Sequence, residues 1–191
     1  MDNFERRAFA DCRAEASDNG RRIMGHAIVF NAPSLDLGGF KEIIAPEAVD
    51  RTLTQALDVH AFFNHDSGVV LGRTRAGTLS MRKDTRGLLV EISPDMEDQQ
   101  IQNIMRKVQR GEITGMSFGF RVLEDDWDYD GKTPVRTVLD MSISEVSVVA
   151  KPAYPQTTAE VAMRSLAAFR ESRGGKSISF LQKWHKTQLA K

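Results

Sequence analysis

Hydrophobic and polar residues alternate in short runs along the middle of the chain. Turn residues and charged segments bound these runs, and bounded runs of this kind predict β-strands. The predicted strands cover residues 21–30, 40–44, 59–66, 68–73, 77–83, 87–93, 111–120, 135–143 and 144–150. So many short strands in one chain predict a meander or barrel.

A first helix is predicted between residues 47 and 58. Val49, Leu53 and Leu57 recur every four residues behind Pro46. This spacing places the three side chains in one apolar stripe on a helix.

A second helix is predicted after Ser93 and Pro94. Serine is a favourable N-cap and proline suits the first helical position. The predicted buried face consists of Ile101, Ile104, Met105 and Val108, and Gly111 suits the C-terminal end of the helix.

These elements predict an α/β protein of the α+β type. The predicted fold is a β-barrel of about seven or eight mostly antiparallel strands surrounded by helices. Residues 1–20 are polar and mixed in charge, and are predicted to be a loosely attached, flexible N-terminal arm. Residues 21–158 form the predicted folded domain, and residues 159–191 read as a helix followed by a basic tail.

Composition and charge exclude several classes of protein. The 26 basic and 26 acidic residues balance, so no overall field draws the chain to nucleic acid or to a membrane surface. The single cysteine, Cys12, excludes an internal disulfide and a cysteine-rich zinc site. The apolar runs are far shorter than a bilayer span. A soluble, cytoplasmic protein is therefore expected.

Ser117 stands in the strand-like stretch "GEITGMSFGF", between Gly115 and Gly119. A serine in a strand is usually structural, but the two glycines leave room for another backbone to approach its hydroxyl. The stretch lacks the strand-turn-helix context of the Gly-x-Ser-x-Gly elbow. Ser117 is therefore a candidate nucleophile that would need a base, for which histidine is the usual partner.

Four histidines are available as that base: His26, His60, His65 and His185. His65 lies where a predicted strand ends and a loop begins. Its position is therefore equally consistent with a catalytic base and with a turn residue. His60, His65 and Asp66 could instead belong to a metal-dependent hydrolase. In a regular strand, however, a spacing of five residues would put the two histidines on opposite faces.

Several motifs occur in an order that resembles one known family. They are "GHAIVFNAPS", "FKEIIAPEAV", "FNHD", "GMSFGF" and "SEVSVVAKPAYPQT", and they span residues 21–158. This order resembles the prohead (capsid maturation) serine proteases of tailed bacteriophages, which are similar to the herpesvirus assemblin proteases. The resemblance implies a β-barrel ringed by helices and a Ser-His dyad with a third supporting residue.

The resemblance assigns roles to individual residues. It implies that Ser117 is the nucleophile and His65 the general base. Assemblin-type enzymes use a second histidine as the third member, but none occurs between Asp66 and Gln182. We therefore expect Glu145 as the third member, with Asp140 as the alternative. The structural interpretation of Glu145 is that it forms an ordinary salt bridge with an arginine.

The resemblance also implies partners and a location. Such enzymes cleave capsid and scaffold protein, and then themselves, inside the immature prohead within the host cytoplasm. They need no cofactor or metal, and association into a homodimer through a helix is expected. The loop 150–156 is the predicted place for the oxyanion hole. A non-enzymatic capsid scaffold component is the remaining alternative, in which Ser117 and His65 are ordinary residues.

Overall fold

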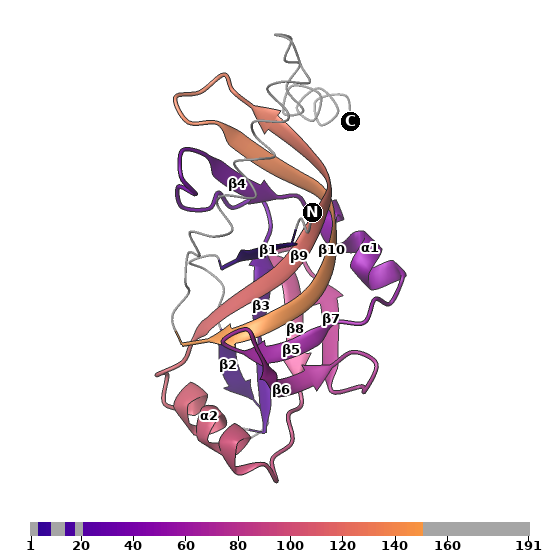
Figure 1. Ribbon diagram of the computed structural model, residues 1–191, viewed down its shortest axis with the longest axis vertical. Coiled ribbons are helices and arrows are strands. Elements are labelled where there is room, and N and C mark those ends of the chain that lie inside the picture. The colour runs from indigo at the N-terminus through magenta and orange to yellow at the C-terminus, as the bar shows by residue number, and fades with distance from the viewer. Residues whose placement is uncertain (1–3, 9–13, 18–20, 151–191) are drawn as a thin grey trace.

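The computed structural model describes residues 4–8, 14–17 and 21–150, and their strands form two sheets (Figure 1). The larger sheet has six strands in the order β1-β9-β10-β5-β6, with β4 also paired to β10. Its strands are β1 (Phe4–Arg7), β4 (Lys41–Ile44), β5 (His60–Phe63), β6 (Asp66–Arg73), β9 (Gly115–Asp128) and β10 (Val135–Val149). The smaller sheet has the order β2-β3-β8-β7. Its strands are β2 (Ala14–Ser17), β3 (Arg22–Val29), β7 (Leu79–Lys83) and β8 (Gly87–Ile92).

The long antiparallel hairpin of β9 and β10 organises the larger sheet. The first part of β10 pairs in parallel with β4, and its last part pairs in parallel with β5. Register shifts between Val138 and Met141, and between Ile143 and Glu145, interrupt the ladder to β9. Bulges of this kind bend a strand and increase its twist. The hairpin is accordingly strongly curved, and the larger sheet curls into a half-barrel (Figure 1).

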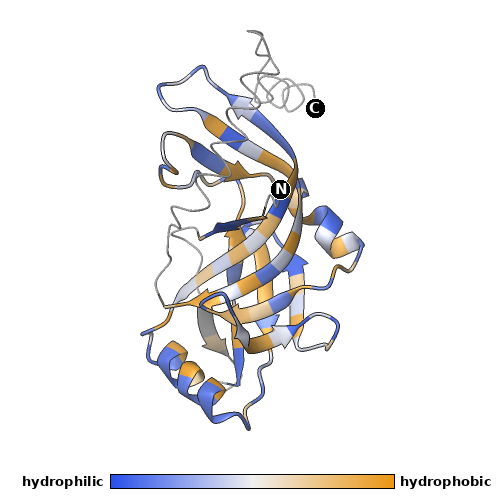
Figure 2. Ribbon diagram, in the orientation of Figure 1, coloured by the Kyte–Doolittle hydropathy of each residue, from blue (hydrophilic) through white to orange (hydrophobic). Residues whose placement is uncertain are grey.

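One hydrophobic cluster contains buried side chains from both sheets. Figure 2 shows apolar and polar residues alternating along β9 and β10, as expected of strands with one face in a core. On β9 the core residues are Met116, Phe118 and Phe120, each with 0% exposure. The odd-numbered residues between them, Ser117 and Gly119, therefore lie on the opposite face of the sheet.

The predicted mixed α+β class is confirmed, and the described strands form two sheets whose strand bounds and number differ from the predicted runs. The difference has two sources. β9 continues through polar residues to Asp128, beyond the run that predicted it, and the two runs predicted at 135–143 and 144–150 form one strand, β10. The N-terminal arm also contributes β1 and β2, which pair with β9 and β3 and so are not loosely attached. Neither strand has an apolar alternation that would have predicted it.

Both predicted helices exist with altered bounds. The first is a 3-10 turn, η1 (Pro46–Val49), followed by α1 (Asp50–Thr54), and Ala56 with φ 46° leaves the helical region soon afterwards. The second, α2 (Gln99–Gln109), has its predicted buried face but begins after Asp98 rather than after Ser93. The backbone N–H of Gln100 donates a hydrogen bond to the Asp98 carboxylate at 2.7 Å, so Asp98 is the N-cap of α2.

The α-helices of the described ranges, α1 and α2, lie at two separate places on the molecule. Figure 1 shows α1 beside the long hairpin and α2 at one end of the molecule. Among the residues placed by the structure, no helix has the length and apolar character required to cross a bilayer. The predicted tail, 159–191, lies outside the described residues.

Asp84 closes the turn between β7 and β8 and carries a pH-dependent part of the stability. Burial raises the pKa of Asp84, but hydrogen bonds from the Gly87 amide, from His26 and from the Arg86 amide outweigh it and lower the pKa to about 2. His26 Nε2 lies 2.9 Å from its Oδ2 atom. Because the folded pKa lies below that of an unfolded aspartate, the ionised carboxylate stabilises the fold above about pH 4.

That stabilisation should be lost as the pH falls through about 2. We therefore expect the free energy of unfolding of the wild type to fall more steeply below about pH 4 than that of Asp84→Asn, whose amide can still accept the turn hydrogen bonds. Urea unfolding at several pH values measures this difference. Parallel pH profiles for the two proteins would refute the assignment.

Candidate active site

Ser117 lies on β9 opposite Ser147 of β10, and its neighbour Gly119 lies opposite Glu145. Residues directly opposite each other in an antiparallel pair project from the same face of the sheet. Ser117, Ser147 and Glu145 therefore share the face that points away from the hydrophobic core. All three are buried, with exposures of 4%, 0% and 4%.

His65 is brought to this face by a tight turn. β5 ends at Phe63, which pairs with Asp66 of β6, so Asn64 and His65 form a two-residue hairpin connection. Both have positive φ, 51° and 63°, as a type I′ turn requires. The Asn64 amide also donates to Val148 O at 2.9 Å, which ties the turn to β10.

Residues other than glycine are uncommon at positive φ, and glycine is the usual second residue of such turns. A non-glycine residue held there costs about 1–3 kcal/mol, and such residues cluster at functional sites. The turn also removes the basis for placing His60 and His65 on opposite faces, because the strand does not extend to His65. His60 instead stacks on Phe62, with 5.5 Å between ring centroids.

The His65 ring contacts Glu145 directly. The distance between His65 Nδ1 and Glu145 Oε1 is 2.7 Å. Arg6 of β1 donates from Nε to the same oxygen at 2.8 Å. Burial raises the pKa of Glu145, but the hydrogen bonds from His65 and Arg6 outweigh it and hold the pKa below its ordinary value. Glu145 is therefore an ionised acceptor.

This contact decides which ring nitrogen of His65 carries the proton. An ionised carboxylate can only accept, so Nδ1 must donate. In the neutral ring this leaves Nε2 with a free lone pair. Glu145 thus fixes the tautomer in which Nε2 can act as a base.

The Ser117 hydroxyl is already engaged in the structure. Its Oγ atom donates to the backbone oxygen of Arg7, on β1, at 2.8 Å. Within the described residues, no hydrogen bond joins His65 to Ser117. The structure therefore joins His65 to Glu145 and places Ser117 on the same sheet face, with its proton directed toward β1.

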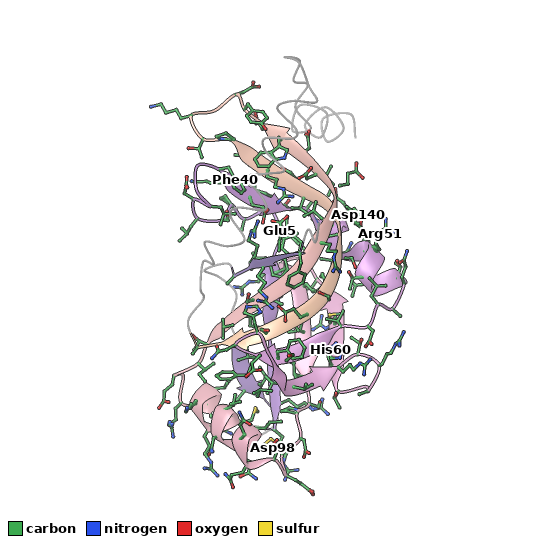
Figure 3. All side chains as sticks on the ribbon, viewed as in Figure 1. Glu5, Phe40, Arg51, His60, Asp98 and Asp140 are labelled. Carbon is green, nitrogen blue, oxygen red and sulfur yellow. The ribbon has the colours of Figure 1, made fainter. Side chains whose placement is uncertain are left out.

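The alternative acid, Asp140, has a different partner. Its carboxylate accepts two hydrogen bonds at 3.0 Å from Arg51 Nε. Figure 3 shows Arg51 and Asp140 together beside α1, apart from His60. Glu145, by contrast, pairs in register with His60, further toward the C-terminal end of β10. Of the two acids, only Glu145 therefore contacts His65.

The residues named for a metal-dependent hydrolase are not gathered into a site. The described ranges contain no group of three histidine, cysteine, aspartate or glutamate side chains that could hold a metal ion. The predicted oxyanion loop lies outside the described residues from Lys151 onward.

Two contributors to the site were missed by sequence reasoning, Arg6 and the backbone oxygen of Arg7. Both belong to "FERR", a stretch with three charged residues in four that lies within the predicted N-terminal arm. This stretch offers no pattern that would distinguish a strand from an arm, because neither the pair Phe4 and Arg6 nor the pair Glu5 and Arg7 forms an apolar face.

Ser147 has a buried hydroxyl with no hydrogen-bond partner among the described residues. An unpaired buried hydroxyl costs about 1–3 kcal/mol of desolvation. We expect Ser147→Ala to raise the free energy of unfolding by about 1 kcal/mol, measured by urea unfolding. Ser144→Ala is the control, because the Ser144 hydroxyl donates to Gly119 O at 3.4 Å. Equal effects of the two substitutions would contradict this expectation.

Comparison with known proteins agrees with the motif order in the sequence. A family model described as caudovirus prohead serine protease matches residues 9–172. The prohead protease of Enterobacteria phage HK97 is 27% identical over 164 residues, which cover 84% of this chain and 65% of that protein. The aligned region thus spans just under two thirds of that relative's length. No solved structure matches the chain. The predicted family is confirmed: the chain belongs to the caudovirus prohead serine proteases.

Proposed function

We propose that this chain is a serine endopeptidase of capsid maturation, with Ser117 as nucleophile, His65 as general base and Glu145 as the supporting acid. The observation that carries the proposal is the hydrogen bond of 2.7 Å between His65 and Glu145 on the sheet face that also bears Ser117. A nucleophile, a base and a third group that orients the base form the set needed to activate a hydroxyl.

The reaction follows from the tautomer of His65. Ser117 Oγ forms a bond to the carbonyl carbon of the substrate while His65 Nε2 takes the hydroxyl proton. The resulting imidazolium is stabilised by Glu145. His65 then returns the proton to the leaving amine as the C–N bond breaks, and a water molecule, activated by the same nitrogen, hydrolyses the acyl-serine ester. Such proton transfer contributes roughly 10²- to 10⁴-fold in rate.

The proposed substrates are the major capsid protein, scaffold segments and the chain itself, cleaved inside the immature prohead in the host cytoplasm. Membership of the prohead protease family supports this choice. The proposal includes a barrel related to that of the herpesvirus assemblins and association into a homodimer. It needs no cofactor, because the three side chains supply both nucleophile and proton transfer.

Co-expression with the major capsid protein of the same phage tests the function. We expect the intact masses of the capsid protein and of this chain to decrease with the wild type and to remain unchanged with Ser117→Ala and with His65→Ala. Equal trimming by all three proteins would place the chemistry elsewhere. Unchanged masses in all three would favour a non-enzymatic scaffold component.

Gly119 gives a further test, because it makes room for the supporting acid. A Cβ atom added at Gly119 would lie 2.6 Å from Glu145 Cγ and 2.7 Å from Oε1, and it would also meet the ring of Phe4. These neighbours are side-chain atoms that can shift, so Gly119→Ala should fold but displace the Glu145 carboxylate from His65. We expect kcat/KM for a capsid-derived peptide to fall about 100-fold, since small misplacements of catalytic groups have effects of this size.

Gly131→Ala is the matched control, because a Cβ atom there would meet its nearest neighbour at 3.6 Å, an ordinary contact. Thermal unfolding of both variants shows whether the fold is retained. A folded Gly119→Ala protein with wild-type kcat/KM would contradict the role given to Glu145.

A further inference from the structure

β1 occupies the edge of the larger sheet beside the candidate nucleophile. It pairs antiparallel with β9, with Arg6 opposite Gly119 and Arg7 opposite Phe118. β1 is the terminal strand of that sheet, so it covers an edge of β9 that would otherwise present unpaired backbone groups. The region matched by the family model begins at residue 9, so this strand precedes it.

Three groups of β1 contact the site itself. The backbone oxygen of Arg7 accepts the Ser117 hydroxyl at 2.8 Å. Arg6 Nε donates at 2.8 Å to the Glu145 oxygen that His65 also contacts. The tip of the Phe4 ring lies beside Gly119, where it would meet an added Cβ atom. β1 therefore touches both the nucleophile and the acid of the proposed triad.

These contacts oppose catalysis. A hydroxyl that donates to Arg7 O does not donate to His65 Nε2, although that transfer is the first step of the proposed reaction. An extended peptide commonly binds by adding a strand to a free sheet edge. On the nucleophile strand that edge is already filled, so a substrate and β1 cannot pair with the same stretch of β9 together.

The opposite face of β1 is anchored by buried ion pairs. Arg7 Nε contacts Glu42 Oε1 at 2.9 Å, and Arg136 contacts Glu5 at 3.0 Å and Glu42 at 3.1 Å. The four side chains are at most 4% exposed. A segment held by paired buried charges has one defined position in the fold. The register of β1 against Ser117 is therefore specified.

These ion pairs can also re-form with another strand. When β1 leaves, Arg136 keeps Glu42 and Asp125 as partners, the latter at 2.7 Å. Glu42 loses Arg7 and then offers a buried carboxylate. An incoming extended peptide with an arginine or lysine at the position of Arg7 would restore the lost pair.

We infer that β1 is an inhibitory strand: it occupies the peptide-binding edge of β9, holds the Ser117 proton away from His65, and is displaced by an extended basic segment of the substrate. This inference rests on the proposed protease function. It adds a latent state in which the completed site is closed by the chain's own N-terminal strand.

A reversible lock on β1 tests the inference. Phe4 lies opposite Arg121 in the β1–β9 ladder. Opposed residues in an antiparallel pair have Cα atoms about 4.5–5.5 Å apart, which suits a disulfide. The double variant Phe4→Cys/Arg121→Cys, with Cys12→Ser to prevent mispairing, can be compared with itself in oxidised and reduced form.

The first readout is the rate at which a fluorophosphonate labels Ser117. We expect the oxidised protein to react at least tenfold more slowly than the reduced protein, and the single-cysteine variants to be insensitive to reduction. Equal rates in the two forms would overturn the inference. So would cleavage of the wild-type chain between Arg7 and Ala8, since β1 would then be a substrate rather than an inhibitor.

The second readout does not depend on catalysis. In the Ser117→Ala protein, hydrogen exchange should show the β1 amides opening at least tenfold faster than those of the β9–β10 ladder, because β1 must leave without global unfolding. Equal exchange rates for the β1 amides and for the amides of the β9–β10 ladder would overturn the inference. Fast opening of β1 in the Ser117→Ala protein, together with a double-cysteine variant whose reduced form never reacts at Ser117, would contradict the proposed function while supporting the displaceable strand.

Discussion

Replacing Ser117 with alanine is expected to lower kcat/KM for a capsid-derived peptide by roughly 10⁴- to 10⁶-fold. In the proposed mechanism Ser117 Oγ is the atom that forms a bond to the substrate, and the substitution removes it. It should leave the fold intact, because the methyl group fits where the buried hydroxyl was and the lost partner, Arg7 O, is a backbone oxygen at the sheet edge. Steady-state kinetics on the purified variant measure the loss.

The other two members of the triad should behave as a unit with Ser117. We expect His65→Ala to match the loss seen with Ser117→Ala, and the double variant to lose little more, because groups that act together are not additive. Glu145→Gln should lower kcat with a smaller effect on KM. Asp140→Asn is the control, since Asp140 pairs with Arg51. A larger loss of kcat with Asp140→Asn than with Glu145→Gln would indicate that Asp140, rather than Glu145, is the supporting acid.

Replacing Arg136 with methionine is expected to lower the free energy of unfolding by about 3–5 kcal/mol. The Arg136 side chain is 1% exposed and pairs with Glu5, Glu42 and Asp125. Burial lowers the pKa of Arg136, but these carboxylates outweigh it and raise the pKa, so the group stays charged. Its loss would leave the buried carboxylates of Glu5 and Glu42 with one cationic partner fewer.

Urea unfolding of Arg136→Met beside Arg51→Met measures this effect. Arg51 also pairs with an aspartate, but its side chain is 40% exposed, so its loss should change stability much less. Similar effects of the two substitutions would contradict the account of the buried network. Faster opening of β1 in Arg136→Met would be a further consequence, because Glu5 would lose one of its two partners.

The elements that sequence predicted well are those with a regular apolar pattern. The predicted buried face of α2 was confirmed, and the strand predicted around Ser117 is β9, on which Met116, Phe118 and Phe120 are buried in regular alternation. Periodicity identifies such elements because burial requires it. The start of α2 was missed, because Ser93-Pro94 and Asp98 are both good start signals and only the structure shows which one caps the helix.

β1 could not be predicted from pattern. Its inward side chains are Glu5 and Arg7, which are buried as ion pairs with residues far along the chain. A sequence scan interprets charges as solvated, and only the tertiary partners make their burial possible. The same reason hid the closed state of the site, since the contact between Ser117 and Arg7 joins positions 110 residues apart.

The site residues were selected from motif order, while their geometry came from the fold. Nothing local distinguishes Glu145 from Asp140, which are both acids on one strand. The bulges of β10 and its parallel pairing with β5 decide which acid meets His65. The turn that presents His65 was also hidden, because type I′ turns are recognised by asparagine and glycine, and histidine occupies the second position here.

The most direct test of the account is the position of the covalent adduct formed with a fluorophosphonate. Peptide mapping of the labelled wild type should place the adduct on Ser117 alone, and the labelling rate should fall by at least 100-fold in His65→Ala, because the base activates the hydroxyl. An adduct on another residue, or a labelling rate that does not depend on His65, would contradict the assignment of Ser117 and His65 as nucleophile and base.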